Sequence, residues 1–126
     1  MPVNWGPHFI VPSKNLVNLS GRVLLRESFD DELLKKDLTE LGFSGIPFRA
    51  VNPWYFRKKK TETWIKIGES SDRDNWFSVP WDTTALNNGD YQILGQMHVH
   101  IKEGERELIL CRQNIVDVKV ENPLLM

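Results

Sequence analysis

The sequence has a single cysteine, no long apolar run and no excess of charge of either sign. Cys111 has no partner in the chain, so an internal disulfide is excluded. No stretch approaches the ~20 consecutive apolar residues of a membrane-spanning helix, so we expect no membrane insertion. The 16 basic and 17 acidic side chains leave a formal net charge of -1. No overall field therefore attracts nucleic acid, which we exclude as a partner.

The chain also lacks the sequence features of secretion and of common catalytic sites. No basic stretch followed by an apolar stretch opens it, so we expect no secretory signal and a protein that is cytoplasmic or part of a cytoplasmically assembled particle. A serine nucleophile elbow, a phosphate-binding glycine loop and a dinucleotide fingerprint are all missing. The sequence therefore predicts a protein without enzymatic activity and without a cofactor.

Two histidines offer an alternative to that prediction. His98 and His100 stand two residues apart on a predicted strand, so both point to one face, a spacing that lets two imidazoles share a metal. Two ligands do not complete a site, although Glu103 and Glu105 follow in the chain. We interpret the histidines as surface side chains with no bound metal, and Cys111 as a buried packing residue rather than a nucleophile.

Alternation of apolar and polar residues predicts a β-rich fold. The length of 126 residues fits one domain. Alternation is clearest over 91–101, and further strands are expected over 16–26, 46–51, 61–67, 76–81, 108–110 and 116–120. About seven strands at a spacing of ~8 to 15 residues predict an all-β, antiparallel β-sandwich.

One segment departs from the strand pattern. In residues 30–41 the leucines at positions 33, 34, 38 and 41 recur at spacings of three and four, and Gly42 follows where a helix C-cap would lie. This pattern predicts one short amphipathic helix, inserted between the first two strands, whose leucines cover the core.

The two ends of the chain differ in composition from the middle. Residues 1–15 hold three prolines together with Trp5 and Phe9, which favours an extended arm over a helix. We therefore divide the chain into an N-terminal arm over 1–15, a sandwich domain over 16–122 and a C-terminal tail over 123–126.

Several stretches resemble a known family of β-sandwich modules. Residues 81–93 read Trp-Asp-Thr-Thr-Ala-Leu-Asn-Asn-Gly-Asp-Tyr-Gln-Ile, and residues 74–79 before them read Asp-Asn-Trp-Phe-Ser-Val. This resembles the second half of bacterial immunoglobulin-like and prealbumin-like (carboxypeptidase-regulatory-like) modules, and residues 19–23 and 45–51 are similar to their opening strands. The resemblance implies an immunoglobulin-like sandwich of about seven strands, with the strand order of the two types left open. Such modules serve as spacers, adhesins, carbohydrate accessories or particle decorations.

Aromatic side chains outside the predicted core are the candidates for partner binding. By alternation, Trp64 and Trp76 fall on the polar faces of their strands, and other rings lie in segments expected to be irregular. Exposed rings mark interfaces. The partner-binding candidates are Trp5, Phe9, Trp54, Tyr55, Trp64 and Trp76.

These observations predict a structural or assembly subunit, of bacterial or phage type, that docks on neighbouring protein subunits through its arm and exposed aromatics. It would belong to a homo- or hetero-oligomeric particle, tail, sheath or filament. The alternative is a carbohydrate-binding or adhesion module whose rings form a platform for sugars. The basic run at 57–60 follows three aromatics, a pairing that single-strand nucleic-acid binders also use. Four charges do not make a groove, so we interpret the run as a solvated hairpin tip.

Overall fold

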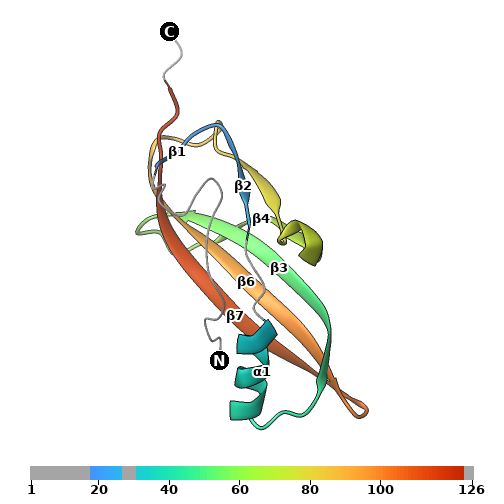
Figure 1. The fold of residues 1–126 in the computed structure, drawn as a ribbon. Helices are drawn as coiled ribbons and strands as arrows, with labels where there is room; N and C mark the ends of the chain where they lie inside the picture. The colour runs from blue at the N-terminus through green and yellow to red at the C-terminus, as the bar shows by residue number, and fades with distance from the viewer. Residues whose placement is uncertain (1–17, 27–30, 124–126) are drawn as a thin grey trace.

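A computed structural model describes residues 18–26 and 31–123, and the predicted arm and most of the predicted tail lie outside these ranges. Strands make up most of the described chain, and α1 is the one α-helix within it (Figure 1). The elements are β1 (Asn18–Leu19), β2 (Arg22–Leu25), α1 (Asp31–Glu40), β3 (Ile46–Lys58), β4 (Ile65–Ser70), the 3-10 turn η1 (Arg73–Asn75), β5 (Val79–Asp82), β6 (Gly89–Glu103) and β7 (Arg106–Val120). The predictions of an all-β class and of an inserted helix are confirmed.

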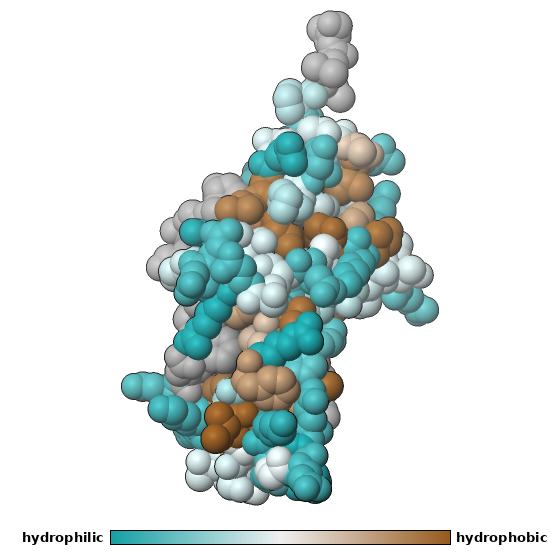
Figure 2. Space-filling model, turned by 90° about the vertical axis from the view of Figure 1, so that its right-hand side faces the viewer, coloured by the Kyte–Doolittle hydropathy of each residue, from teal (hydrophilic) through white to brown (hydrophobic). Residues whose placement is uncertain are grey.

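The strands form one sheet of five and one sheet of two. The larger sheet has the order β1-β7-β6-β3-β4, and the smaller one pairs β2 with β5. Neighbouring strands are antiparallel except for β1, which runs parallel to β7, so the larger sheet is mixed rather than purely antiparallel. The long strands β3, β6 and β7 cross the molecule side by side, and α1 lies across their lower part (Figure 1). On one face of the molecule, hydrophobic side chains gather in an upper and a lower group, with hydrophilic side chains between them (Figure 2).

The strands β6 and β7 form a long hairpin because their alternation is continuous. Each has 15 residues, and their pairing runs without a shift from Gly89 opposite Val120 to Glu103 opposite Arg106. Gly104 turns the chain with φ of 62°, a conformation that costs glycine little. The side chains predicted to face inward on this hairpin are buried or half-buried: Tyr91, Ile93, Met97, Val99, Ile101, Leu108, Leu110, Val116, Val118 and Val120.

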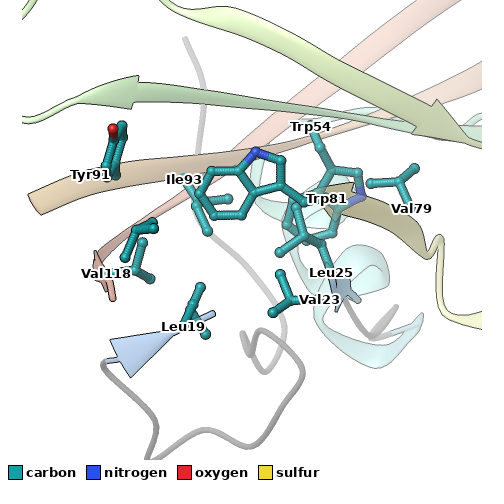
Figure 3. Packing of buried hydrophobic residues seen from close by; sticks show 10 residues of the cluster. Leu19, Val23, Leu25, Trp54, Val79, Trp81, Tyr91, Ile93 and Val118 are labelled. Atoms are coloured by element: carbon teal, nitrogen blue, oxygen red, sulfur yellow. The ribbon is translucent and has the colours of Figure 1, made fainter. Parts of the chain in front are cut away.

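The upper core lies between the inner face of the large sheet and the β2–β5 pair. Its side chains come from six of the strands (Figure 3), and its buried members are Leu19, Val23, Leu25, Trp54, Val79, Trp81, Tyr91, Ile93, Val118 and Val120. Phe56, Trp81 and Tyr91 form a triangle of rings with centroids 5.4 to 6.5 Å apart. Aromatic pairs at such distances stabilise a core beyond their buried area.

The lower core lies between α1 and the same face of the sheet. Leu34 and Leu38 are buried against side chains of β6 and β7, as the leucine spacing predicted. The helix ends at Glu40 and is capped at Gly42, where φ is 78°, and the Phe43 N–H donates to the Leu38 carbonyl at 2.8 Å. This is the bond of a Schellman cap. Leu41 was expected in the apolar stripe but is 49% exposed, because it lies beyond the last helical turn.

A charged pair is buried beside the lower core. The Arg112 guanidinium on β7 contacts the Asp37 carboxylate on α1, and their side chains are only 2% and 13% exposed. Burial lowers the pKa of Arg112 to about 10. On β6, Met97 pairs with Arg112, and Asn52 of β3 lies one residue after Val51, whose partner is His98, the residue next to Met97. Asn52 is completely buried, and no described group donates a hydrogen bond to its Oδ1.

Strand pairing and hydrogen bonds join the start of the described chain to its end. Leu19 pairs with Val120. The Asn122 Oδ1 accepts a hydrogen bond from the Gly21 N–H at 2.8 Å, and its Nδ2 donates to the Thr83 carbonyl at 2.8 Å. Asn122 therefore links the connection between β1 and β2, the end of β5 and the end of β7.

Several predicted strand boundaries were wrong. The strand expected over 46–51 continues to Lys58, and the two strands expected over 108–110 and 116–120 form the single strand β7. The strand expected over 16–26 is broken at Gly21, whose φ of 66° sends β1 and β2 into different sheets. The strand expected over 61–67 instead spans Ile65–Ser70, because its pairing with β3 begins at Ile65 and continues past Gly68. Trp76 and Phe77 have φ of 59° and 52°, so the expected strand over 76–81 begins only at Val79.

Candidate interaction surface

The outer face of the large sheet is the surface that the described elements leave open. The β2–β5 pair and α1 both pack on the opposite, inner face, through the two cores. The outer face is formed by alternate residues of β3, β6 and β7, and the strand pairing arranges them in rows. From one end to the other these rows are Arg49–His100–Ile109, Val51–His98–Cys111, Gln96–Gln113, Tyr55–Leu94–Ile115 and Arg57–Gln92–Asp117.

Large apolar side chains are exposed on this face. Ile109 is 59% exposed and Ile115 is 44% exposed, although both lie on the longest strand pair of the molecule. Phe48, at an irregularity in the pairing of β3 with β6, is 54% exposed, and its ring meets the His100 ring edge-on at 6.1 Å. Leu94 is buried between its row neighbours Tyr55 and Ile115. The outer face therefore carries apolar surface at both ends of its middle strands.

A polar network closes one end of the face. The Arg57 Nε donates to the Gln92 Oε1 at 2.8 Å, and the Gln92 Nε2 donates to the Asp117 carboxylate at 2.9 Å. The hydrogen bond from Gln92, followed by that from Lys59, lowers the pKa of Asp117. Arg57 also lies 4.2 Å from the centre of the Trp64 ring, a cation–π distance. The basic run therefore sits at a solvated hairpin tip between β3 and β4, as predicted.

Histidines and a cysteine lie in the middle of the face. The His100 Nδ1 is 2.9 Å from the Glu107 carboxylate, and the His98 Nε2 is 3.1 Å from the Gln96 Oε1. Cys111 is half-buried, and burial raises the pKa of its thiol, the direction that disfavours a thiolate nucleophile. Within residues 18–26 and 31–123, no three or more His, Cys, Asp or Glu side chains are grouped so that they could hold a metal ion.

We expect His98 to make folding stability depend on pH. Burial, and then the neighbouring His100, lower the pKa of His98 in the folded protein. The unfolded chain therefore binds the proton first as pH falls below about 6.5, and the free energy of unfolding decreases. Chemical denaturation at several values between about pH 7 and about pH 5.5 should show a shallower slope for His98→Gln than for the parent. An unchanged slope would contradict this assignment, since carboxyl groups with lowered pKa act only below about pH 4.5.

The structure corrects one partner-binding candidate and places the others differently. Trp54 was expected in an irregular, exposed segment, but it lies within β3 on the inner face and is 1% exposed. Its Nε1 donates to the Phe77 carbonyl at 2.9 Å, so Trp54 belongs to the core. Tyr55 and Trp64 are half-buried near the polar end of the outer face. Trp76 is 43% exposed but contacts Arg26, just after β2, at 5.4 Å from the ring centre.

Two candidates lie outside the described residues, and three exposed apolar residues were not among the candidates. Trp5 and Phe9 lie outside the described residues. Sequence reasoning missed Phe48, Ile109 and Ile115, because 46–51 and 108–110 were interpreted only for their inward residues. The signal that could have found the isoleucines is their position: each stands at an odd number in a strand whose even-numbered residues face inward.

The fold therefore defines an all-β protein with a mixed five-stranded sheet, a two-stranded sheet and one short helix. Comparison with known families finds no family model that matches the chain, and comparison with curated proteins finds no match. The resemblance to immunoglobulin-like and prealbumin-like modules thus stays a prediction. None of the helices in the described ranges is long and apolar enough to cross a membrane.

Proposed function

We propose that the protein is a non-enzymatic structural or assembly subunit that docks on a neighbouring protein subunit through the outer face of its large sheet. The observation that carries this proposal is the exposure of Ile109 and Ile115 on the outer face, where the continuous pairing of β6 with β7 fixes their positions. Phe48 adds an exposed ring beside His100, at the irregularity in β3. Apolar side chains gathered on a face without a described covering element mark protein interfaces.

The composition of the face agrees with a docking surface. Burying each of its exposed apolar side chains in an interface contributes about 1.5 to 3 kcal/mol at full burial. The network of Arg57, Gln92 and Asp117 supplies a polar border at one end. A rigid hairpin also presents these side chains without a large cost in ordering them on binding.

We propose further that the fold is a variant of the immunoglobulin-like or prealbumin-like sandwich. Support comes from the two-layer arrangement, in which the β2–β5 pair covers the large sheet, and from Trp81 and Tyr91 of the resembling stretch, which pack in the core between the layers. The parallel β1–β7 pair departs from a purely antiparallel sandwich.

The carbohydrate-binding alternative has less support on the described residues. A sugar platform needs flat rings that present a face to solvent. Trp54 is buried, and Arg57 stacks on the ring of Trp64. Tyr55 lies in β3 and Trp76 lies between η1 and β5, so these two rings do not form a sugar platform with Trp64.

The docking proposal is tested by the double variant Ile109→Ser, Ile115→Ser. We expect it to weaken association with the native neighbouring subunit by about 2 kcal/mol or more, roughly 30-fold, because both side chains would be anchors in the interface. Both are substantially exposed, so the isolated protein should stay folded. Affinity is measured with the proteins that co-purify with the chain, and self-association by size-exclusion chromatography with light scattering.

The matched control is Leu24→Ser. Leu24 is 40% exposed on β2, which packs on the other side of the large sheet, so its replacement should leave association unchanged. A parent protein that stays monomeric at high concentration and also binds no native neighbour would refute the assembly function. Equal losses in the double variant and the control would refute the outer face as its site.

A further inference from the structure

One row of the outer face carries opposite charges on its two flanking strands. Arg57 of β3 and Asp117 of β7 both pair with Gln92 of β6, one from each side. The hydrogen bonds from Arg57 to Gln92 and from Gln92 to Asp117 show that all three side chains lie on the same face. The row therefore runs from a positive group, through a neutral amide, to a negative group.

Both charged groups keep the capacity to bind a further partner. Arg57 uses its Nε in the hydrogen bond to Gln92, and a guanidinium carries further N–H donors on its other two nitrogens. The Asp117 carboxylate accepts from Gln92 on one oxygen and from Lys59 on the other, and each oxygen can accept more than one hydrogen bond. The Asp117 side chain is 61% exposed. Opposite charges on a docked surface can therefore reach both groups.

The next row along the strands is apolar. Tyr55 of β3 and Ile115 of β7 flank Leu94 of β6, which is buried between them, while Ile115 is 44% exposed. On β6 itself, the outward residues around Leu94 are Gln92 and Gln96, so the middle of this part of the face carries no charge. The outer face thus has an uncharged central column, with its complementary groups on the two flanking strands.

We propose that the partner of the outer face is a second copy of this chain, related to the first by a two-fold axis that runs along β6 over Leu94. This inference rests on the docking function proposed above and names its partner. The axis places β3 of each copy over β7 of the other, so Arg57 meets the second copy's Asp117 and Tyr55 meets its Ile115. Each contact occurs twice, as in the self-complementary two-fold interfaces that are commonest among identical subunits.

The charges select this arrangement over the other face-to-face pairing. An axis across the strands at the middle row would stack β3 on β3 and bring Arg57 toward the second copy's Arg49, and like charges at an interface are unfavourable. An axis along β6 instead joins opposite charges. Face-to-face sheets keep their strand directions within about 30° of each other, so the rows next to Leu94 stay opposed. An unrelated protein would need the same arrangement of charges, whereas a second copy already carries it.

The test uses the charge reversals Arg57→Asp and Asp117→Arg, with oligomeric state measured by light scattering and by sedimentation equilibrium. We expect a dimeric parent and a dimer weakened about tenfold or more in each variant, because two attractions become like-charge contacts. An equimolar mixture of the two variants should recover the dimer, since each contact between unlike chains again joins opposite charges.

The matched control is Lys58→Asp. Lys58 is the neighbour of Arg57 on β3 but, by alternation, faces the other side of the sheet, so its reversal should leave the dimer unchanged. Circular dichroism checks that all three variants are folded.

Failure of this inference is distinguishable from failure of the docking function. A parent that stays monomeric at high concentration, yet binds a co-purifying neighbour through Ile109 and Ile115, overturns the second copy as partner and leaves the docking function standing. A dimer that the double isoleucine variant disrupts, but that mixing of the charge variants does not recover, overturns this axis. A dimer that neither set of substitutions weakens overturns both the inference and the outer face as the docking site.

Discussion

Asp37→Ala is expected to lower the free energy of unfolding by about 3 to 5 kcal/mol, a large share of the stability of a domain of this size. The reason lies in the partner that remains. Arg112 is 2% exposed beneath α1, so removal of the Asp37 carboxylate leaves a guanidinium buried without its opposite charge. Burial also lowers the pKa of Arg112 to about 10, the direction that disfavours the charged form.

Urea denaturation of the parent and the variant measures this change. The double variant Asp37→Leu, Arg112→Met should recover most of the loss, because an apolar pair of similar volume replaces a buried ion pair at little cost. Glu69→Ala is the matched control, since it breaks an ion pair with Lys66 in which both side chains are half-exposed, and little change is expected. A loss for Asp37→Ala as small as that control would contradict the importance of the buried pair.

Trp54→Ala is expected to lower the free energy of unfolding by about 3 to 5 kcal/mol, because it removes the largest fully buried side chain of the upper core. Trp54→Phe keeps most of the apolar volume but loses the hydrogen bond to the Phe77 carbonyl, so a smaller loss of about 1 to 2 kcal/mol is expected. Both are measured by chemical denaturation. Equal losses in the free energy of unfolding for Trp54→Ala and Trp54→Phe would contradict this role of the indole in the upper core.

The parts of the fold that could be predicted are those in which local pattern and burial agree. The alternation in 91–101 correctly gave the inward residues of β6, because β6 lies between two strands and its pattern is not interrupted. The leucine spacing in 30–41 gave α1, whose sequence offers no competing alternation. In both segments the side chains themselves determine which face is buried.

Other features depend on partners distant in sequence, which local patterns do not report. β3 contains Pro47 and Pro53, which locally disfavour a strand, yet the pairing with β6 holds the segment extended. Arg112 is accommodated on the buried face of β7 because the Asp37 carboxylate of α1 contacts its guanidinium. Trp54 and Tyr55 seemed equivalent in the sequence, and only the continuous strand places one ring inside and the other outside. The exposed isoleucines of the candidate surface are a different case, because local alternation could have revealed them and only the inward residues had been interpreted.

The contacts that join β1 and the β1–β2 connection to β7 and Asn122, at opposite ends of the described chain, affect how the protein folds during synthesis. β1 pairs with β7, its parallel neighbour, and Gly21 and Thr83 make their hydrogen bonds with Asn122, which follows β7. These contacts therefore form only after β7 and Asn122 have left the ribosome. Until then the nascent chain leaves apolar surface of the upper core open to chaperones or to premature association, a vulnerability typical of folds rich in distant pairings.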